Sequence, residues 1–152
     1  MTTPEPIAIA ADQGGFELKK TLIAELEAAG FKPLDLGTYS TDSVDYPDIA
    51  NTLVDAIRAG KAKRGVVICG TGIGVSIAAN RHPFIRAGLC HSTTDARLTR
   101  QHNDANVLAL GGRTIGVEVA KDILRVFLAT EFEGGRHARR VAKLGTPEKV
   151  ES

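Results

Sequence analysis

Residues 65–74 read Gly-Val-Val-Ile-Cys-Gly-Thr-Gly-Ile-Gly, an apolar run that ends in Cys69 and opens directly into three glycines separated by single residues. Such a run is typical of a buried β-strand that is followed by a tight turn. A helix over residues 75–80 would direct the unpaired N–H groups of its first turn toward Cys69. The stretch therefore predicts a site for an anionic oxygen beside a thiolate, which is a hypothesis about catalysis.

Three familiar glycine-rich loops do not fit this spacing. A P-loop has Lys and then Ser or Thr after its second glycine, whereas Gly70 is followed by Thr71 with no lysine beside it. A dinucleotide-binding fingerprint needs G-x-G-x-x-G after the first strand and an acidic residue about 20 positions later, and neither is found here. A nucleophile elbow would place Ser76 at the turn, but Ser76 lies within the expected helix.

Apolar runs and amphipathic stretches alternate along the rest of the chain. Strands are expected over 7–11, 32–36, 66–69, 86–90 and 106–110, and helices over 16–29, 49–58, 75–80, 93–101 and 117–128. This alternation predicts a parallel sheet with helices on both faces. Ligands of such sheets bind outside the carboxyl ends of the strands, which would bring Asp12, Gln13 and the segments 69–74, 90–91 and 111–113 to one rim.

A glycine turn after residue 132 leads into an expected sixth helix that ends near residue 144. Arg136 and Arg140 lie four positions apart, so they share one face of this helix. Paired guanidinium groups suit a phosphate, and the alternative is a basic helix that simply faces the solvent. We expect one domain over residues 1–152, with flexible tails at residues 1–6 and 145–152.

Composition excludes several classes of protein. A chain of 152 residues can bury about 70% of its unfolded surface, so it needs no disulfides for stability. The 19 Lys and Arg residues nearly balance 18 Asp and Glu residues, which predicts no field that would recruit nucleic acid or a membrane. Cys69 and Cys90 each end an apolar run, which favours a reduced protein. With no signal-like start and no long apolar run, we expect a cytoplasmic location.

Five motifs carry a resemblance to a known family. They read Ser-Val-Asp-Tyr-Pro-Asp at 43–48, Ile-Cys-Gly-Thr-Gly-Ile-Gly at 68–74, Ser-Ile-Ala-Ala-Asn at 76–80, His-Asn-Asp-Ala-Asn-Val-Leu at 102–108 and Phe-Glu-Gly-Gly-Arg-His at 132–137. Over residues 7–144 the chain resembles the ribose-5-phosphate isomerase B family, which includes galactose-6-phosphate and allose-6-phosphate isomerases. The resemblance implies a Rossmann-like three-layer α/β/α sandwich with a five-stranded parallel sheet.

The resemblance also implies an activity and an assembly. The expected reaction interconverts an aldose phosphate and a ketose phosphate through an enediolate, without a metal or another cofactor. Such a reaction needs a base, donors for the enediolate oxygen and an acid or base that opens the cyclic sugar. The expected partners are a small sugar phosphate and a second copy of the chain, in a homodimer or a dimer of dimers whose active sites are shared between subunits.

Individual residues match positions with known roles in that family. Cys69 occupies the position of the base, and His102 that of the histidine that opens the sugar ring with help from Thr71. The positions that match substrate-binding residues are Asp12, Gln13, Gly70, Thr71, Gly72, Ile73, Gly74, Asn103, Arg113, Arg136 and Arg140. Simpler roles remain open: an inert thiol for Cys69, a helix cap for Asp12, a surface or capping histidine for His102, and a local backbone bond for Thr71.

Two departures from the family pattern affect the expected substrate. Gln13 stands where the family has a histidine, and segment 90–96 lacks an acidic third residue. Ribose 5-phosphate is the expected substrate, with another four- to six-carbon sugar phosphate (erythrose, allose or galactose phosphate) and a non-catalytic sugar-phosphate-binding domain as alternatives. His137 and Arg139 are weaker site candidates. His82, His91 and Cys90 lack the spacing of metal ligands, so we expect no metal site.

Overall fold

The computed structural model describes residues 3–145, which contain five strands and six helices. In chain order these are β1 (Pro6–Ala11), α1 (Phe16–Ala28), β2 (Lys32–Asp35), α2 (Tyr46–Arg58), β3 (Arg64–Cys69), α3 (Ile73–Ala79), β4 (Ala87–Leu89), α4 (Thr93–Asn103), β5 (Val107–Gly111), α5 (Val117–Ala129) and α6 (Arg136–Leu144). No helix within this range is both long enough and apolar enough to cross a bilayer.

All strands are parallel and lie in the order β2-β1-β3-β5-β4. The chain moves from β1 outward to β2 and then returns to the other side of β1 for β3. The order therefore reverses between β1 and β3, and the carboxyl ends of these two strands form the kind of crevice in which open α/β sheets bind ligands.

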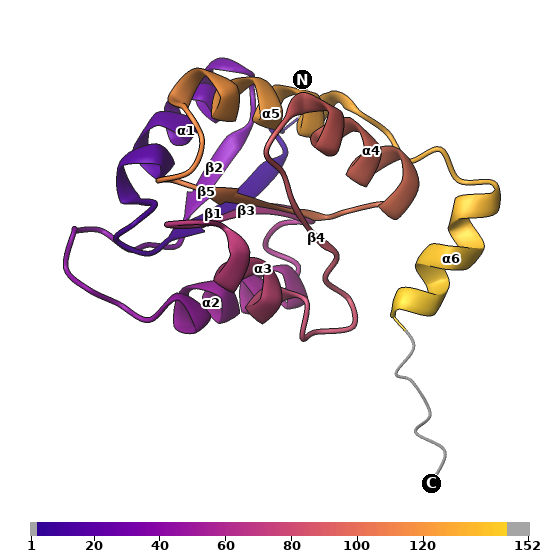
Figure 1. Ribbon diagram of the computed structural model, residues 1–152, viewed down its shortest axis with the longest axis horizontal. Coiled ribbons are helices and arrows are strands. Elements are labelled where there is room, and N and C mark those ends of the chain that lie inside the picture. The colour runs from indigo at the N-terminus through magenta and orange to yellow at the C-terminus, as the bar shows by residue number, and fades with distance from the viewer. Residues whose placement is uncertain (1–2, 146–152) are drawn as a thin grey trace, which may run out of the picture.

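Helices cover both faces of the sheet, as Figure 1 shows, with α1, α4 and α5 on one face and α2 and α3 on the other. Alternate residues of each strand enter the two cores. Ile7 and Ile9 pack with α1 and α5, whereas Ala8 and Ala10 pack with α2 and α3. All four are fully buried, so the strands are apolar on both faces. The predicted three-layer α/β/α sandwich with a five-stranded parallel sheet is confirmed.

Two helices begin earlier than the sequence predicted. Helix α2 starts at Tyr46 and not at residue 49, because Pro47 lies in the first turn, where its missing N–H is not needed. Helix α3 starts at Ile73 and not at residue 75, and its N-cap Gly72 has a φ of 78°. Ile73 and Gly74, predicted to lie in the loop, therefore belong to the helix.

The last two residues of the predicted N-terminal tail, Glu5 and Pro6, make contacts with the sheet. Pro6 already lies in β1 and aligns with Lys32 of β2. Glu5 accepts two hydrogen bonds from the guanidinium of Arg64, at 2.8 and 2.9 Å, which ties it to β3. At the other end, Gly145 caps α6, and the remainder of the predicted tail at 145–152 lies outside the described residues.

Candidate active site

Cys69 and Asp12 meet at the carboxyl ends of β3 and β1. Cys69 is the last residue of β3, and Asp12 directly follows β1, where its N–H donates to the carbonyl of Ile68 at 3.1 Å. Both side chains are nearly buried, with exposed fractions of 5% and 7%. The sheet therefore places a thiol beside a carboxylate at the point where the strand order reverses.

A glycine-rich turn holds the sulfur of Cys69. The N–H of Gly72 donates to Cys69 Sγ at 3.2 Å. The turn is fixed to the loop after β5 by two bonds: Gly112 N–H donates to the carbonyl of Cys69 at 2.8 Å, and Arg113 N–H donates to the carbonyl of Gly70 at 2.9 Å. These bonds fix the position of the Cys69 sulfur at the carboxyl end of β3.

Arg113 lies against this turn. A Cβ atom built on Gly70 would be 3.4 Å from Cδ of Arg113 and 3.5 Å from its Nη1, so the guanidinium stem passes beside Gly70. A Cβ atom on Gly14 would be only 2.8 Å from the backbone N of Gly70, which any larger residue would push away. Close contact between the loops after β1 and β3 thus requires glycine at position 14.

Asp12 and Gln13 face different neighbours. Asp12 Oδ1 accepts a hydrogen bond from Gly14 N–H at 2.9 Å, and the N-cap of α1 is Gly15, so Asp12 is not the helix cap that sequence allowed. Gln13 Oε1 accepts from Val44 N–H at 3.0 Å, which ties the rim of the sheet to the loop before α2. Thr71 Oγ1 accepts from Ile73 N–H at 3.2 Å, the local bond that was its simpler role.

We call these residues the thiol cluster. They make up most of the predicted site, and they lie at the carboxyl ends of the strands. Its members are Asp12, Gln13, Cys69, Gly70, Thr71, Gly72, Ile73, Gly74 and Arg113. Ile73 and Gly74 extend it into the first turn of α3, where Gly74 lies against the ring of Tyr46.

His102 and Asn103 lie at the opposite end of the sheet, where the strands begin. They end α4, which begins after β4 and runs back to its start, since Arg86 Nε donates to the carbonyl of Asp104 at 2.8 Å. The carboxyl ends and the amino ends of the strands are separated by the length of β5, about 13 Å at 3.3 Å per residue. Within one chain, His102 and Cys69 therefore do not meet.

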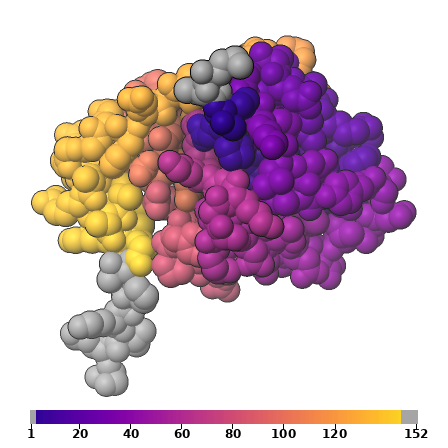
Figure 2. Space-filling view, turned by 180° about the vertical axis from the view of Figure 1, so that it is seen from behind, coloured from indigo at the N-terminus to yellow at the C-terminus, as the bar shows by residue number. Residues whose placement is uncertain are grey.

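Helix α6 brings Arg136, His137 and Arg140 to the same end of the molecule as α4 (Figures 1 and 2). His102, Asn103, His137 and Arg140 line one surface hollow. Arg136 and Arg140 are exposed in the single chain. We call His102, Asn103, Arg136, His137 and Arg140, together with Glu133, the histidine cluster. Figure 2 shows the C-terminal segment on one flank and the N-terminal third of the chain on the other.

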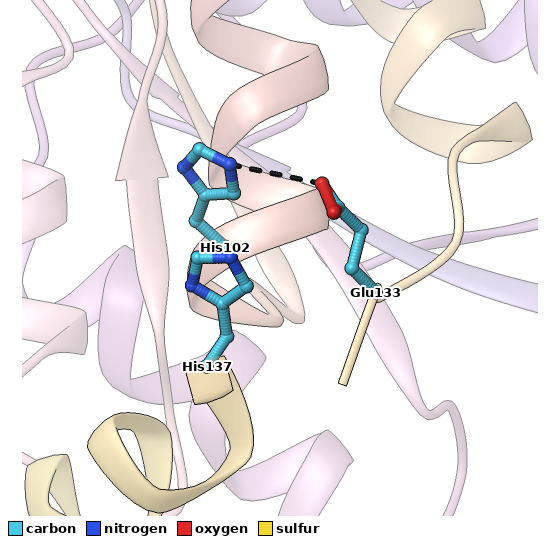
Figure 3. A group of neighbouring side chains, drawn as sticks. All are labelled: His102, Glu133 and His137. Carbon is cyan, nitrogen blue, oxygen red and sulfur yellow. Dashed lines mark ion pairs between the residues drawn. The ribbon is translucent and has the colours of Figure 1, made fainter. Parts of the chain in front are cut away.

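The rings of His102 and His137 are stacked, as Figure 3 shows. Their centroids are 4.3 Å apart and their planes differ by 14°, while Glu133 Oε1 lies 3.7 Å from Nε2 of His102. Burial is the largest effect that lowers the pKa of His137, and the charge of His102 follows. Arg136 and Arg140 lower this pKa further, and Glu133 acts against them.

A family model described as ribose/galactose isomerase matches residues 7–144, nearly all of the part that the structure describes. The chain belongs to the ribose/galactose isomerase family. The resemblance inferred from the five motifs is confirmed.

Relatives in this family have different names for their substrates. The ribose-5-phosphate isomerase B of Escherichia coli is 46% identical over 135 residues, which cover 89% of this chain and 91% of that protein. The D-erythrulose-4-phosphate isomerase of Pectobacterium atrosepticum is also 46% identical, over 149 residues that cover 95% of this chain and 96% of that protein. A ribose 5-phosphate isomerase structure from Thermotoga maritima superposes with a TM-score of 0.90 at 50% identity, covering 93% of this chain and 97% of that one.

Two residues of the histidine cluster are not evident from the sequence of this isomerase family member: Glu133 has no predicted role, and His137 is only a weaker candidate. The motif at 132–137 assigns no role to its glutamate, because a bond from the Glu133 N–H to the carbonyl of Gln101 places that residue beside α4, and a sequence pattern does not reveal such a bond. For His137 the available signal is the glycine pair at 134 and 135, since such a pair marks a sharp change of chain direction.

His102, Glu133 and His137 are also the one group within residues 3–145 whose side chains are of metal-binding types and have ligand atoms within 4.8 Å of one another. Parallel stacked imidazoles direct their lone pairs along nearly parallel planes, so the lone pairs do not converge on one ion. Arg136 and Arg140 add positive charge nearby. The arrangement suits interaction between the two rings better than coordination of a cation.

The second cysteine of this isomerase family member is in a different environment. Cys90 is fully buried, and its desolvation, followed by the charge of Asp95, raises the pKa of its thiol to about 12. The thiolate is the reactive form, so Cys90 is unreactive at neutral pH.

We expect iodoacetamide at pH 8 to modify Cys69 and to spare Cys90 in the folded protein. Intact mass should show at most one added group in the wild type, none in Cys69→Ala, and two in wild-type protein unfolded in urea. Peptide mapping that finds the label on Cys90 of folded protein would contradict the assignment.

Proposed function

We propose that this protein is an aldose–ketose isomerase that converts ribose 5-phosphate to ribulose 5-phosphate. The observation that carries the proposal is the Cys69 thiol at the strand crossover, with the Gly72 N–H on its sulfur, in a chain of the ribose/galactose isomerase family. The two relatives of equal identity support a sugar phosphate with four or five carbons.

Cys69 is the proposed base. As a thiolate it removes the proton from carbon 2 of the open-chain aldose. The electron pair of the broken C–H bond becomes the second bond between carbons 1 and 2, while the pair of the carbonyl π bond moves to the oxygen on carbon 1. Backbone N–H groups of residues 70–74 and the Asn103 amide would hold this enediolate oxygen. A proton then passes from the oxygen on carbon 2 to that on carbon 1, and the thiol returns its proton to carbon 1, which yields the ketose.

His102 is the proposed acid and base for ring opening, with Thr71 as a hydrogen-bonding partner of the ring oxygen. It takes the proton of the anomeric hydroxyl and supplies one to the ring oxygen, so the bond between the anomeric carbon and that oxygen breaks. An imidazole can do both near neutral pH. Asp12 and Gln13 would bind sugar hydroxyls.

We propose that the site is shared between two copies of the chain in a homodimer. The thiol cluster lies at the carboxyl ends of the strands and the histidine cluster at their amino ends, and the reaction needs both clusters. Ile73 and Ile77 of α3 and Tyr46 of α2 form an exposed apolar surface beside the thiol cluster. A two-fold axis would cover this surface and give two equal sites, each with Cys69 from one chain and His102 from the other.

Arg136 and Arg140 would bind the substrate phosphate in the shared site. Replacing either by Ala should raise KM at least about tenfold and change kcat much less, because loss of a desolvated charged contact costs about 2–5 kcal/mol. Arg139→Ala, on the same exposed helix, is the matched control and should leave KM within about twofold. Unchanged KM in both single variants would make α6 a solvated basic helix.

The substrate is tested with a panel of sugar phosphates. Isomerisation of ribose 5-phosphate, erythrose 4-phosphate, allose 6-phosphate and galactose 6-phosphate is followed by NMR, with Cys69→Ala prepared in parallel to exclude contaminating activity. We expect the highest kcat/KM with ribose 5-phosphate. A higher value with another sugar would change the substrate but not the reaction, and binding without turnover of any sugar would support the non-catalytic alternative.

A further inference from the structure

The imidazole ring of His137 packs against one face of the His102 ring. His137 enters from the first turn of α6, is only 7% exposed, and lies parallel to His102 of α4, with 4.3 Å between ring centroids (Figure 3). A ring stacked on a buried flat surface cannot rotate about its Cβ–Cγ bond without losing that contact.

The chain reaches this arrangement through a specific turn. Glu133 N–H donates to the carbonyl of Gln101 at 3.1 Å, which anchors the loop to the last turn of α4. Gly134 and Gly135 then have φ values of 69° and 56°, a left-handed pair that other residues rarely adopt. The turn closes with a bond from His137 N–H to the carbonyl of Gly134 at 3.0 Å, which brings α6 back beside His102.

The charges around the stack disfavour protonation of His137. His137 faces His102 from α4, Glu133 from the loop, and Arg136 and Arg140 from its own helix, and the net effect with burial is a pKa below the ordinary value for histidine. A second imidazolium against His102 would also repel it. His137 therefore remains neutral near pH 7, whereas the Glu133 carboxylate lies 3.7 Å from the Nε2 edge of His102.

We propose that His137 and Glu133 are positioning residues for His102: the His137 ring fixes the plane of the His102 imidazole by stacking, and the Glu133 carboxylate fixes the direction of its Nε2 edge. The proposal rests on the proposed function, in which His102 opens the sugar ring. Ring opening transfers protons over hydrogen-bond distances, so an imidazole free to rotate would rarely be in the productive orientation.

The kinetic test compares His137→Phe, which keeps a flat ring without an ionisable group, with His137→Ala, which removes the ring. With ribose 5-phosphate we expect His137→Ala and Glu133→Gln to lower kcat by about tenfold with little change in KM, and His137→Phe to stay within about threefold of the wild type. Erythrose 4-phosphate cannot close a five-membered ring, because its O4 carries the phosphate, so its kcat should be spared in all three variants.

A second measurement does not depend on activity. In NMR spectra of the wild type, the ring protons of His102 should be shifted upfield by the stacked ring, and the shift should persist in His137→Phe and disappear in His137→Ala. Equal kinetic damage in His137→Phe and His137→Ala, or His102 ring signals that are the same in wild type and His137→Ala, would overturn the proposal. If the wild type turns over no sugar phosphate, the proposed function fails, while these spectra still decide whether His137 orients His102.

Discussion

Cys69→Ala is expected to fold normally and to lose at least about a hundredfold in kcat, since a general base contributes about 10²–10⁴-fold to a proton transfer. KM for ribose 5-phosphate should change little, because the phosphate and hydroxyl contacts come from other residues. Steady-state kinetics of purified variants provide the measurement.

Two controls separate chemistry from packing. Cys69→Ser keeps an acceptor for the Gly72 N–H at similar size, so it preserves the turn but lacks an easily ionised group. Cys90→Ala removes the other buried thiol, which lies outside the thiol cluster, and it should retain wild-type kcat. Activity above about a tenth of wild type in Cys69→Ala would assign the base to another group.

His102→Asn should reduce kcat with ribose 5-phosphate by about a hundredfold while leaving turnover of erythrose 4-phosphate within a few fold. The reason is that only the first sugar must open a ring before the enediolate can form. Parallel assays of both substrates with the same enzyme preparation give the comparison. Equal losses on both substrates would assign His102 to the proton transfer at carbon or to the structure of the histidine cluster.

The sheet was predictable because its strands are continuous apolar runs separated by amphipathic stretches. Such runs are buried on both faces of the sheet, as Ile7 and Ala8 are. The alternation of strands and helices favours a parallel sheet over other arrangements. The starts of α2 and α3 were less accessible. They depend on Pro47 in a first turn and on the left-handed Gly72, features that hydrophobic periodicity does not reveal.

The thiol cluster could be predicted from the sequence, and the histidine cluster only in part. Cys69 and Asp12 follow strands, so the rule that ligands bind at the carboxyl ends of a parallel sheet brings them together. His102 lies in the last turn of α4, which runs back to the amino ends of the strands. Glu133 reaches His102 only because its backbone N–H bonds to the carbonyl of Gln101. Contacts of this kind depend on tertiary packing between segments that sequence periodicity treats separately.

A shared site is the central claim, and mixing two inactive variants tests it most directly. Cys69→Ala and His102→Asn chains, carrying different affinity tags, are co-expressed, and the dimers that contain both are purified. In such a hybrid, one site receives Cys69 from one chain and His102 from the other, both intact, while the second site lacks both.

We expect the purified hybrid to show about half of the wild-type kcat per dimer with ribose 5-phosphate, far above either parent, because one of two symmetric sites is complete. Activity of the hybrid no higher than the mean of its two inactive parents would contradict the account, since it would mean that each site takes Cys69 and His102 from the same chain.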